Sequence, residues 1–276
     1  MYGVYQEGVY RFDALRDFSM QMRYVEIHRD DPENEYDSHV HPQCEIYINL
    51  TGDVSFMVEN RIYPILPGTV IITRPYEYHH CIYHTNALHK HIWALFSAEG
   101  NETLFPRFFD RASGEGNLLI LPPEKQTELI SLCHHMMDTQ EGASERLYQF
   151  FYLMHLLDSA DVAEQGNSTY PQDVTLALDW INAHFAEPIV IGELAAAAHV
   201  SINTLERHFA EVLHLSPSAY LKKKRLARAA EALYAGESVM EACVGSGFSD
   251  YSNFIALFKR TYDMTPLNYQ KKMRRT

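Results

Sequence analysis

The sequence has little cysteine, and its four cysteines are scattered. Cys44, Cys81, Cys133 and Cys243 form no C-x-x-C pair in a chain of 276 residues. Pairs of that kind hold zinc ribbons, and closely spaced even sets mark a disulfide framework. The spacing speaks against both, and we expect reduced thiols in a cytoplasmic protein.

Long apolar runs are missing as well. Charged residues such as Arg11 and Asp13 interrupt the first twenty positions, so no signal peptide is visible. No run approaches the roughly 18 residues that a membrane-spanning helix needs. Neither a P-loop nor a nucleophile–histidine–acid set is recognisable. We therefore expect no membrane partner and no enzymatic activity.

Positive charge is scarce in the chain as a whole, with 23 basic and 36 acidic residues and a formal net charge of −13. It is unevenly placed. Residues 1–170 hold 11 basic against 25 acidic side chains, a net of −14, whereas residues 222–276 hold 11 against 5, a net of +6. Binding to DNA phosphates requires local positive charge. We expect the C-terminal end to contact DNA and the acidic half to have another task.

The N-terminal half has the pattern of short strands separated by turn signals such as Thr51-Gly52 and Pro67-Gly68. This pattern predicts an all-β sandwich or barrel. The expected strands are Met22–His28, Cys44–Leu50, Asp53–Glu59, Thr69–Thr73 and Leu88–Ser97.

Helical spacing begins after Pro122-Pro123. Residues 124–138 and 144–158 carry apolar side chains at i, i+3, i+4 and i+7. This helix pair can pack on the strands as core or form a dimer seam, and the sequence leaves both open. The apolar positions are Leu129, Leu132, Cys133 and Met136 in the first helix and Leu147, Phe150, Phe151 and Met154 in the second.

The C-terminal part is predicted to be helical throughout, with seven helices. Its helix-start signals are a hydroxyl that caps free N–H groups and a proline at the first helical position. These signals occur at Ser201, Ser216-Pro217, Ser249 and Thr265-Pro266.

Two stretches of this part repeat each other. Each copy predicts a short helix, a tight turn and a second helix, which is the helix-turn-helix arrangement. Two copies in tandem are far more specific than one. The matches are Ala195-x4-Val200-Ser201 with Cys243-x4-Phe248-Ser249 at an offset of 48, and Phe209-x7-Pro217-x2-Tyr220 with Phe258-x7-Pro266-x2-Tyr269 at an offset of 49.

The repeat resembles the AraC family of transcription regulators, best over Gly247–Phe254, Phe258-Lys-Arg and Thr265-Pro266-x-x-Tyr269. In that family one helix joins the two units, and here it would run from Pro217 to about Tyr234. Eighteen helical residues span about 27 Å. That length suits recognition helices in successive major grooves about 34 Å apart.

The resemblance also implies which side chains meet DNA. They are Asn203, Thr204, Glu206 and Arg207 in the first unit, and Tyr251, Ser252, Asn253, Lys259 and Arg260 in the second. Asparagine suits adenine and arginine suits guanine. Arg207 can instead contact phosphate, and Glu206 can act by orienting Arg207. Ile255 and Ala256 stand where the family has polar readers, so we expect the second unit to hold phosphates more than it reads bases.

Residues 39–79 resemble the cupin pattern H-x-H-x3-E…P-G…H, which implies a small β-barrel with a pocket. His39, His41 and Glu45 share parity on a strand, and His79 or the adjacent His80 completes the set. Three interpretations stay open. The residues bind a divalent metal such as Fe, Mn, Ni or Zn, they bond an organic effector, or they are rim histidines.

Aromatic residues add to this region. Tyr47, Tyr78 and Trp93 can line a pocket and stack on a sugar ring, or they can be plain core. The sequence alone does not separate these two roles.

The sequence thus predicts an α+β chain. Residues 1–160 would form a cupin-like sensor and dimerisation domain with the connecting helix pair, residues 161–171 a linker, and residues 172–276 an all-α domain with two helix-turn-helix units. The leading hypothesis is a homodimeric AraC-type regulator that binds double-stranded DNA, a small-molecule effector such as a sugar, and RNA polymerase. The alternatives are a metal-dependent cupin enzyme or metal sensor fused to DNA-binding helices, and an effector-independent DNA binder whose barrel only dimerises.

Overall fold

The computed structural model describes residues 5–12, 18–30, 41–138, 142–163 and 170–273. It divides into two compact units, of which the first holds most of the chain up to residue 167, and the second holds the chain from residue 168 onward together with short stretches at His41 and Asn60. The first unit is rich in strands and the second is helical, so the predicted α+β class is confirmed. No helix of the described ranges has the length and apolar character to cross a membrane.

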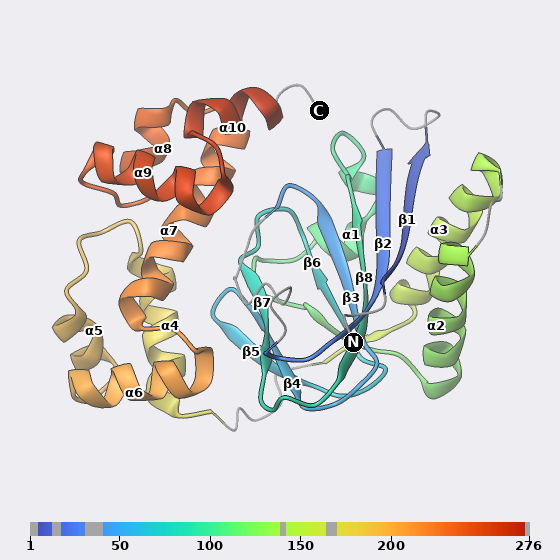
Figure 1. Ribbon diagram of the computed structural model, residues 1–276, viewed down its shortest axis with the longest axis horizontal. Coiled ribbons are helices and arrows are strands. Elements are labelled where there is room, and N and C mark those ends of the chain that lie inside the picture. The colour runs from blue at the N-terminus through green and yellow to red at the C-terminus, as the bar shows by residue number, and fades with distance from the viewer. Residues whose placement is uncertain (1–4, 13–17, 31–40, 139–141, 164–169, 274–276) are drawn as a thin grey trace. The chain divides into compact units, whose positions relative to one another are not determined.

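The first unit contains two antiparallel sheets (Figure 1). The larger sheet has the order β1 (Tyr5–Phe12), β2 (Phe18–Ile27), β8 (His89–Phe96), β3 (Cys44–Asn49), β6 (Val70–Thr73), β9 (Leu118–Ile120) and β10 (Asp161–Val162). The smaller sheet has the order β5 (Arg61–Ile65), β4 (Val54–Val58) and β7 (His79–Tyr83). The five predicted strands correspond to β2, β3, β4, β6 and β8.

One edge of the smaller sheet is formed by β5, which contains Pro64. Proline has no backbone N–H, so strands tolerate it at an edge and not at the centre of a sheet. The Pro64 side chain is exposed while its neighbours Tyr63 and Ile65 are buried. The strand therefore keeps an alternating pattern, with one face in the core.

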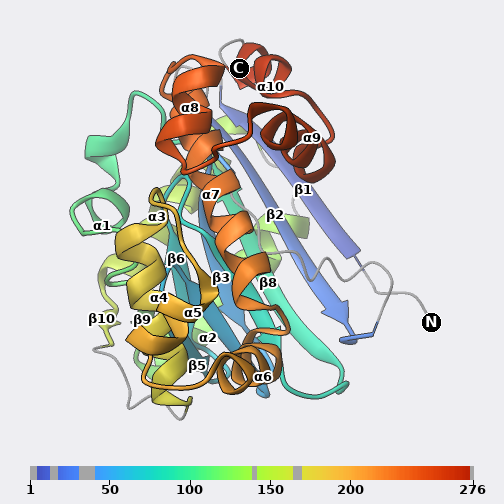
Figure 2. The same cartoon turned by 90° about the vertical axis from the view of Figure 1, so that its left-hand side faces the viewer.

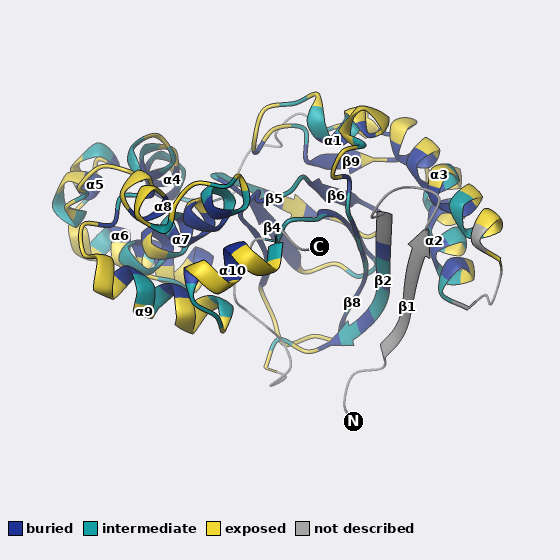
Figure 3. Cartoon of the chain, turned by 90° about the horizontal axis from the view of Figure 1, so that it is seen from above, coloured by how far each residue is buried: buried dark blue, intermediate teal, exposed yellow. Residues whose placement is uncertain are grey.

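The larger sheet has apolar residues on both faces. On one face, Ile46 and Ile48 of β3 belong to a core shared with α2 (Pro123–Asp138) and α3 (Ala143–Asp158). On the other face, Tyr47 packs with Phe56 of the smaller sheet. Figure 3 shows the buried strands and the more exposed outer faces of α2 and α3. A short helix, α1 (Pro106–Phe109), and a 3-10 turn, η1 (Glu102–Leu104), follow β8.

The helix pair packs on the sheet as core. Leu129, Cys133 and Phe150 are fully buried against it. Phe151, which shares the predicted apolar spacing, is 37% exposed, and Tyr148 is 64% exposed. One face of the pair therefore belongs to the core, and the outer face of α3 still presents two aromatic rings for other contacts.

The second unit contains seven helices within residues 170–273, and no strand among them, as predicted (Figure 2). The helix α7 has the predicted bounds. The helices are α4 (Gln172–His184), α5 (Ile191–Ala197), α6 (Ile202–Leu213), α7 (Pro217–Tyr234), α8 (Val239–Gly245), α9 (Tyr251–Tyr262) and α10 (Pro266–Met273).

Most of the predicted helix starts are confirmed. The hydroxyls of Ser201 and Ser216 accept hydrogen bonds from backbone N–H groups at the starts of α6 and α7. Thr265 does the same for α10. The prediction for Ser249 is wrong by one residue, because Asp250 caps α9 and accepts from the Asn253 N–H at 3.0 Å.

The two helix-turn-helix copies share one turn geometry. His199 and Gly247 have φ of 60° and 81°, at an offset of 48. Their N–H groups donate to the carbonyls of Ala196 and Val244 at 3.0 and 2.9 Å. The offset becomes 49 at the caps Ser201 and Asp250, so the extra residue of the second copy lies at the end of its turn.

Gly247 also approaches α4 closely. A Cβ atom there would lie 2.6 Å from the Phe185 carbonyl oxygen and 2.9 Å from Ala186 Cα. Arg225 of α7 donates to the same Phe185 carbonyl at 2.7 Å. The second turn therefore packs on the C-terminal end of α4 through a position that only glycine fits.

Gly247→Ala should lower the free energy of unfolding by about 2 kcal/mol or more, because a left-handed backbone costs a non-glycine residue about 1–2 kcal/mol before the clash is added. Urea denaturation measures this loss. The control is Gly245→Ala, where a Cβ meets nothing within 4 Å. There alanine should be neutral or stabilising. Equal losses in both variants would contradict the close approach.

Candidate functional site

The first recognition helix, α6, presents its predicted readers on the surface. Asn203, Glu206 and Arg207 are exposed, whereas Leu205 and Phe209 on the opposite face are buried. Thr204 is half-buried and its hydroxyl lies 2.9 Å from the Ser201 hydroxyl. The helix thus has one face in the core of its unit and one polar face that is free to meet a major groove.

In α9 the same division holds at an offset of 49. Phe254 and Phe258 are buried, where the first copy has Leu205 and Phe209. The exposed residues are Tyr251, Ser252, Asn253, Lys259 and Arg260. Ala256 is exposed and Ile255 half-buried, so the face of α9 that corresponds to Glu206 and Arg207 carries no charge.

In the first unit, the predicted pocket residues Glu45 and His79 meet. Glu45 Oε2 of β3 lies 2.8 Å from His79 Nε2 of β7, and both side chains are buried. His79 Nδ1 lies 2.7 Å from the Glu77 carbonyl oxygen. Burial lowers the pKa of His79, but the Glu45 carboxylate and the Glu77 carbonyl together raise it above its usual value. Two acceptors on one ring favour a protonated imidazole that donates to both.

His41 lies beside this pair. One ligand atom from each of His41, Glu45 and His79 lies within 4.8 Å of the others. His41 precedes β3 instead of lying on it, because the strand begins at Cys44. His79, not His80, makes the contact with Glu45. His39 lies outside the described residues.

Two further histidines of β8 are buried near Tyr47. The Tyr47 hydroxyl lies 2.6 Å from His89 Nε2, and the His91 ring stacks on Tyr47 at 4.8 Å. Burial lowers the pKa of His89 to about 4 and that of His91 to about 3. Both rings are therefore neutral at physiological pH. His91 Nδ1 is buried and has no hydrogen-bond partner in the part of the chain that the structure describes.

The three aromatic candidates belong largely to the core. Tyr47 and Tyr78 are 4% and 1% exposed. Trp93 is half-buried, with the Arg23 guanidinium 5.5 Å from its ring centroid. His89 and His91 are not among the predicted site residues, although both lie on the predicted strand 88–97 with the same parity as Trp93. That parity was the available signal.

Two family models match the chain. The model of an AraC-like ligand binding domain covers residues 24–157, and that of a helix-turn-helix domain covers residues 194–272. The chain belongs to the AraC family. It is therefore a DNA-binding transcription regulator, as the tandem repeat indicated, and has an N-terminal ligand-binding domain.

Relatives of the AraC-family chain include two HTH-type transcriptional activators RhaS. That of Klebsiella pneumoniae (strain 342) is 28% identical over 251 residues, and that of Escherichia coli (strain SE11) 27% over 252. Each alignment covers 85% of this chain and 87% of the relative. A solved DNA-binding transcriptional dual regulator from Escherichia coli K-12 is 27% identical, over 40% of this chain and 100% of that one, with a TM-score of 0.36.

A buried carboxylate that is not among the predicted site residues stabilises the ligand-binding domain of this regulator. Glu77 is 1% exposed, and its oxygens lie 2.7 and 2.9 Å from the Arg111 guanidinium. It also accepts from the Gly114 N–H at 2.8 Å and from Asn117 Nδ2 at 3.0 Å. Its own carbonyl accepts from His79, so the network connects directly to the candidate pocket.

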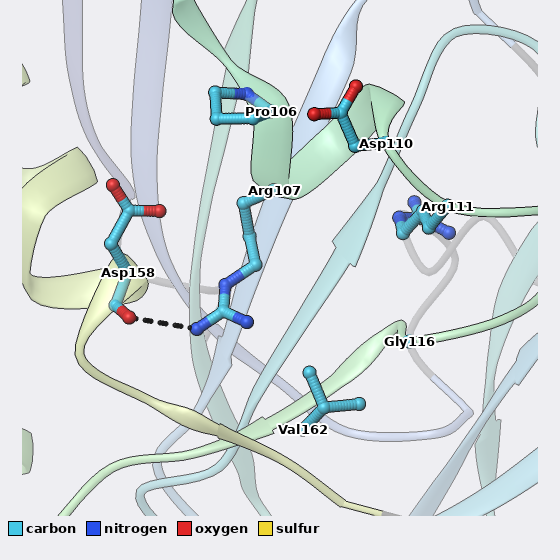
Figure 4. Close-up of a pocket in the computed structure, with 7 residues that line it drawn as sticks. All are labelled: Pro106, Arg107, Asp110, Arg111, Gly116, Asp158 and Val162. Carbon is cyan, nitrogen blue, oxygen red and sulfur yellow. Dashed lines mark hydrogen bonds between the residues drawn. The ribbon is translucent and has the colours of Figure 1, made fainter.

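A groove of about 380 Å³ lies on the same unit (Figure 4). Its guanidinium groups are engaged with the protein. Arg107 donates to the carbonyls of Leu157 and Asp158 at the end of α3, and Arg111 pairs with Glu77. None of the residues that line the groove belongs to the predicted pocket. Its two arginines make structural hydrogen bonds and an ion pair within the unit.

Glu77→Gln should lower the free energy of unfolding by about 3–5 kcal/mol, because it leaves the Arg111 guanidinium buried without its counter-charge. Denaturant titration measures the change. Glu99→Gln is the control, since Glu99 is exposed. An effect of Glu77→Gln as small as that of the control would show that the network contributes little to stability.

Proposed function

We propose that this AraC-family regulator activates transcription in the cytoplasm as a homodimer and contacts RNA polymerase while bound to double-stranded DNA. Its relatives are named transcriptional activators, which supports this direction of regulation and a role other than catalysis. The outer face of α3, with Tyr148 and Phe151 exposed, is a candidate surface for the dimer.

The two helix-turn-helix copies have different roles on DNA: the first recognises bases and the second binds phosphates. In the first helix-turn-helix copy Asn203 and Arg207 are exposed on α6, and both side chains suit base edges in the major groove. In the second copy Lys259 and Arg260 are exposed in the last turn of α9 and suit phosphates. The single observation behind this proposal is the uncharged face of α9 at Ile255 and Ala256.

Arg207→Ala should cost about 1–3 kcal/mol of binding free energy on the preferred duplex and relax base preference there. Lys259→Ala should weaken binding to all duplexes alike and reduce the salt slope by about one unit. Titrations against preferred and scrambled duplexes at several salt concentrations measure both effects. Equal weakening of both duplexes by Arg207→Ala would make Arg207 a phosphate contact.

For the ligand-binding domain, we propose an organic effector that bonds Glu45, His79 and His91. Glu45 and His79 offer a buried ion pair, and His91 offers a neutral ring whose Nδ1 is buried and unpaired within the described residues. Charged and neutral polar groups beside the rings of Tyr47 and Phe56 suit a ligand with hydroxyl groups, such as a sugar.

The geometry also favours a second candidate, a divalent metal. His41, Glu45 and His79 supply two nitrogen donors and one oxygen donor in one small cluster. Such a set suits first-row ions. The Glu77 carbonyl would hold His79 through Nδ1 and leave Nε2 for the ion, as ligating histidines usually require. A bound ion would polarise a ligand placed beside it.

His41→Ala and His91→Ala separate the two candidates. A thermal-shift screen with sugars and with Zn²⁺ or Mn²⁺ should raise Tm for the true ligand, because binding to the native state stabilises it. An organic effector should lose its shift in His91→Ala and keep most of it in His41→Ala. A metal should show the reverse, together with stoichiometric metal in untagged protein. No shift with any ligand would favour the effector-independent binder.

A further inference from the structure

A chain of three polar side chains connects α4 to the exposed face of the first recognition helix. His208 of α6 has Nδ1 at 2.8 and 3.0 Å from the two carboxylate oxygens of Asp173, in the first turn of α4. The other ring nitrogen, Nε2, lies 3.1 Å from a guanidinium nitrogen of Arg207. The Asp173 and His208 side chains are 9% and 21% exposed, whereas Arg207 is 63% exposed.

The proton positions in this chain follow from its chemistry. A guanidinium carries only donors, so Nε2 must accept the hydrogen bond from Arg207. A carboxylate carries only acceptors, so Nδ1 must donate to Asp173. The two hydrogen bonds together require the tautomer of His208 that carries its proton on Nδ1 alone. Asp173 selects this tautomer, and the tautomer creates the acceptor that Arg207 uses.

The second helix-turn-helix copy has no such chain among its described residues. Arg207 and His208 correspond to Ala256 and Leu257 at the offset of 49 that aligns the two recognition helices. The acceptor and the arginine are thus present together in one helix-turn-helix copy and replaced together in the other. A role of His208 confined to packing would give no reason for this pairing.

We propose that Asp173 and His208 position the Arg207 guanidinium for base recognition by the first helix-turn-helix copy. An exposed arginine samples many rotamers, and fixing it before DNA arrives reduces the entropy that binding must overcome. Glu211, whose oxygen lies 4.0 Å from the other terminal nitrogen of Arg207, limits the same side chain from the next turn of α6. His208 and Asp173 are positioning residues. The proposal rests on the proposed role of Arg207 in reading a base.

The test compares His208→Leu with the conservative variant His208→Gln in the full chain. The probes are a duplex selected from a randomised pool by the unaltered protein and a scrambled duplex, at one salt concentration. His208→Leu should reduce the ratio of the two affinities about fivefold, as part of what a bidentate arginine contributes. His208→Gln should restore most of the ratio, since a glutamine amide can donate to Asp173 and accept from Arg207.

Each variant is repeated in an Arg207→Ala background, where His208→Leu should change the ratio no further. A loss of equal size in that background, or equal weakening of both duplexes, would overturn the proposal. If Arg207→Ala reduces the ratio and His208→Leu does not, only the positioning role fails. If Arg207→Ala itself leaves the ratio unchanged, the proposed reading role fails first.

Nitrogen-15 NMR of the imidazole gives a readout that does not depend on DNA. His208 should show a neutral ring with its proton on Nδ1, and Asp173→Ala should shift the tautomer balance toward Nε2. A proton on Nε2 in the unaltered protein would exclude the bond from Arg207. This measurement decides the proposal even if His208→Leu does not fold.

Discussion

The buried carboxylate of Glu77 is the interaction on which the ligand-binding domain most depends. It lies in the loop between β6 and β7, and its partners Arg111, Gly114 and Asn117 lie in the loop before β9. It also accepts from the Arg74 N–H at 3.0 Å, and a carboxylate so deeply buried requires a set of donors of this size. Because the Glu77 carbonyl also holds His79, the orientation of a candidate ligand-binding ring is fixed by a residue whose carboxylate does not take part in the candidate pocket.

A comparable constraint operates in the second unit, where α4 contacts both helix-turn-helix copies. Asp173 at its start bonds His208 of the first recognition helix. The carbonyl of Phe185 at its end accepts from Arg225 and lies against Gly247 of the second turn. The two copies are therefore connected through α4 as well as through the linking helix α7. A displacement of the start of α4 would therefore move the first recognition helix, α6. A displacement of its end would move the turn that precedes the second recognition helix, α9.

Local sequence patterns predicted the helices better than the site. The seven helices and strands such as β3 and β8 follow from periodicity and caps, which are properties of neighbouring residues. The sequence missed β5 because Pro64 interrupts its pattern, and it placed a cap on Ser249 because the extra residue hides the shift to Asp250. The Glu77 network and the contact of His208 with Asp173 join residues 34 to 40 positions apart. Nothing in one sequence marks such pairs.

The position of Pro64 has a consequence for how the regulator behaves in a crowded cell. An edge strand displays unpaired N–H and C=O groups, and a second chain can add a strand there and begin a growing β aggregate. Pro64 removes one donor from the middle of β5 and places a rigid ring on its exposed face. The smaller sheet is thereby protected against extension on that side. Among the described strands the other sheet edges are β7, β1 and β10, which contain no proline, so Pro64 limits strand addition at one edge of the four.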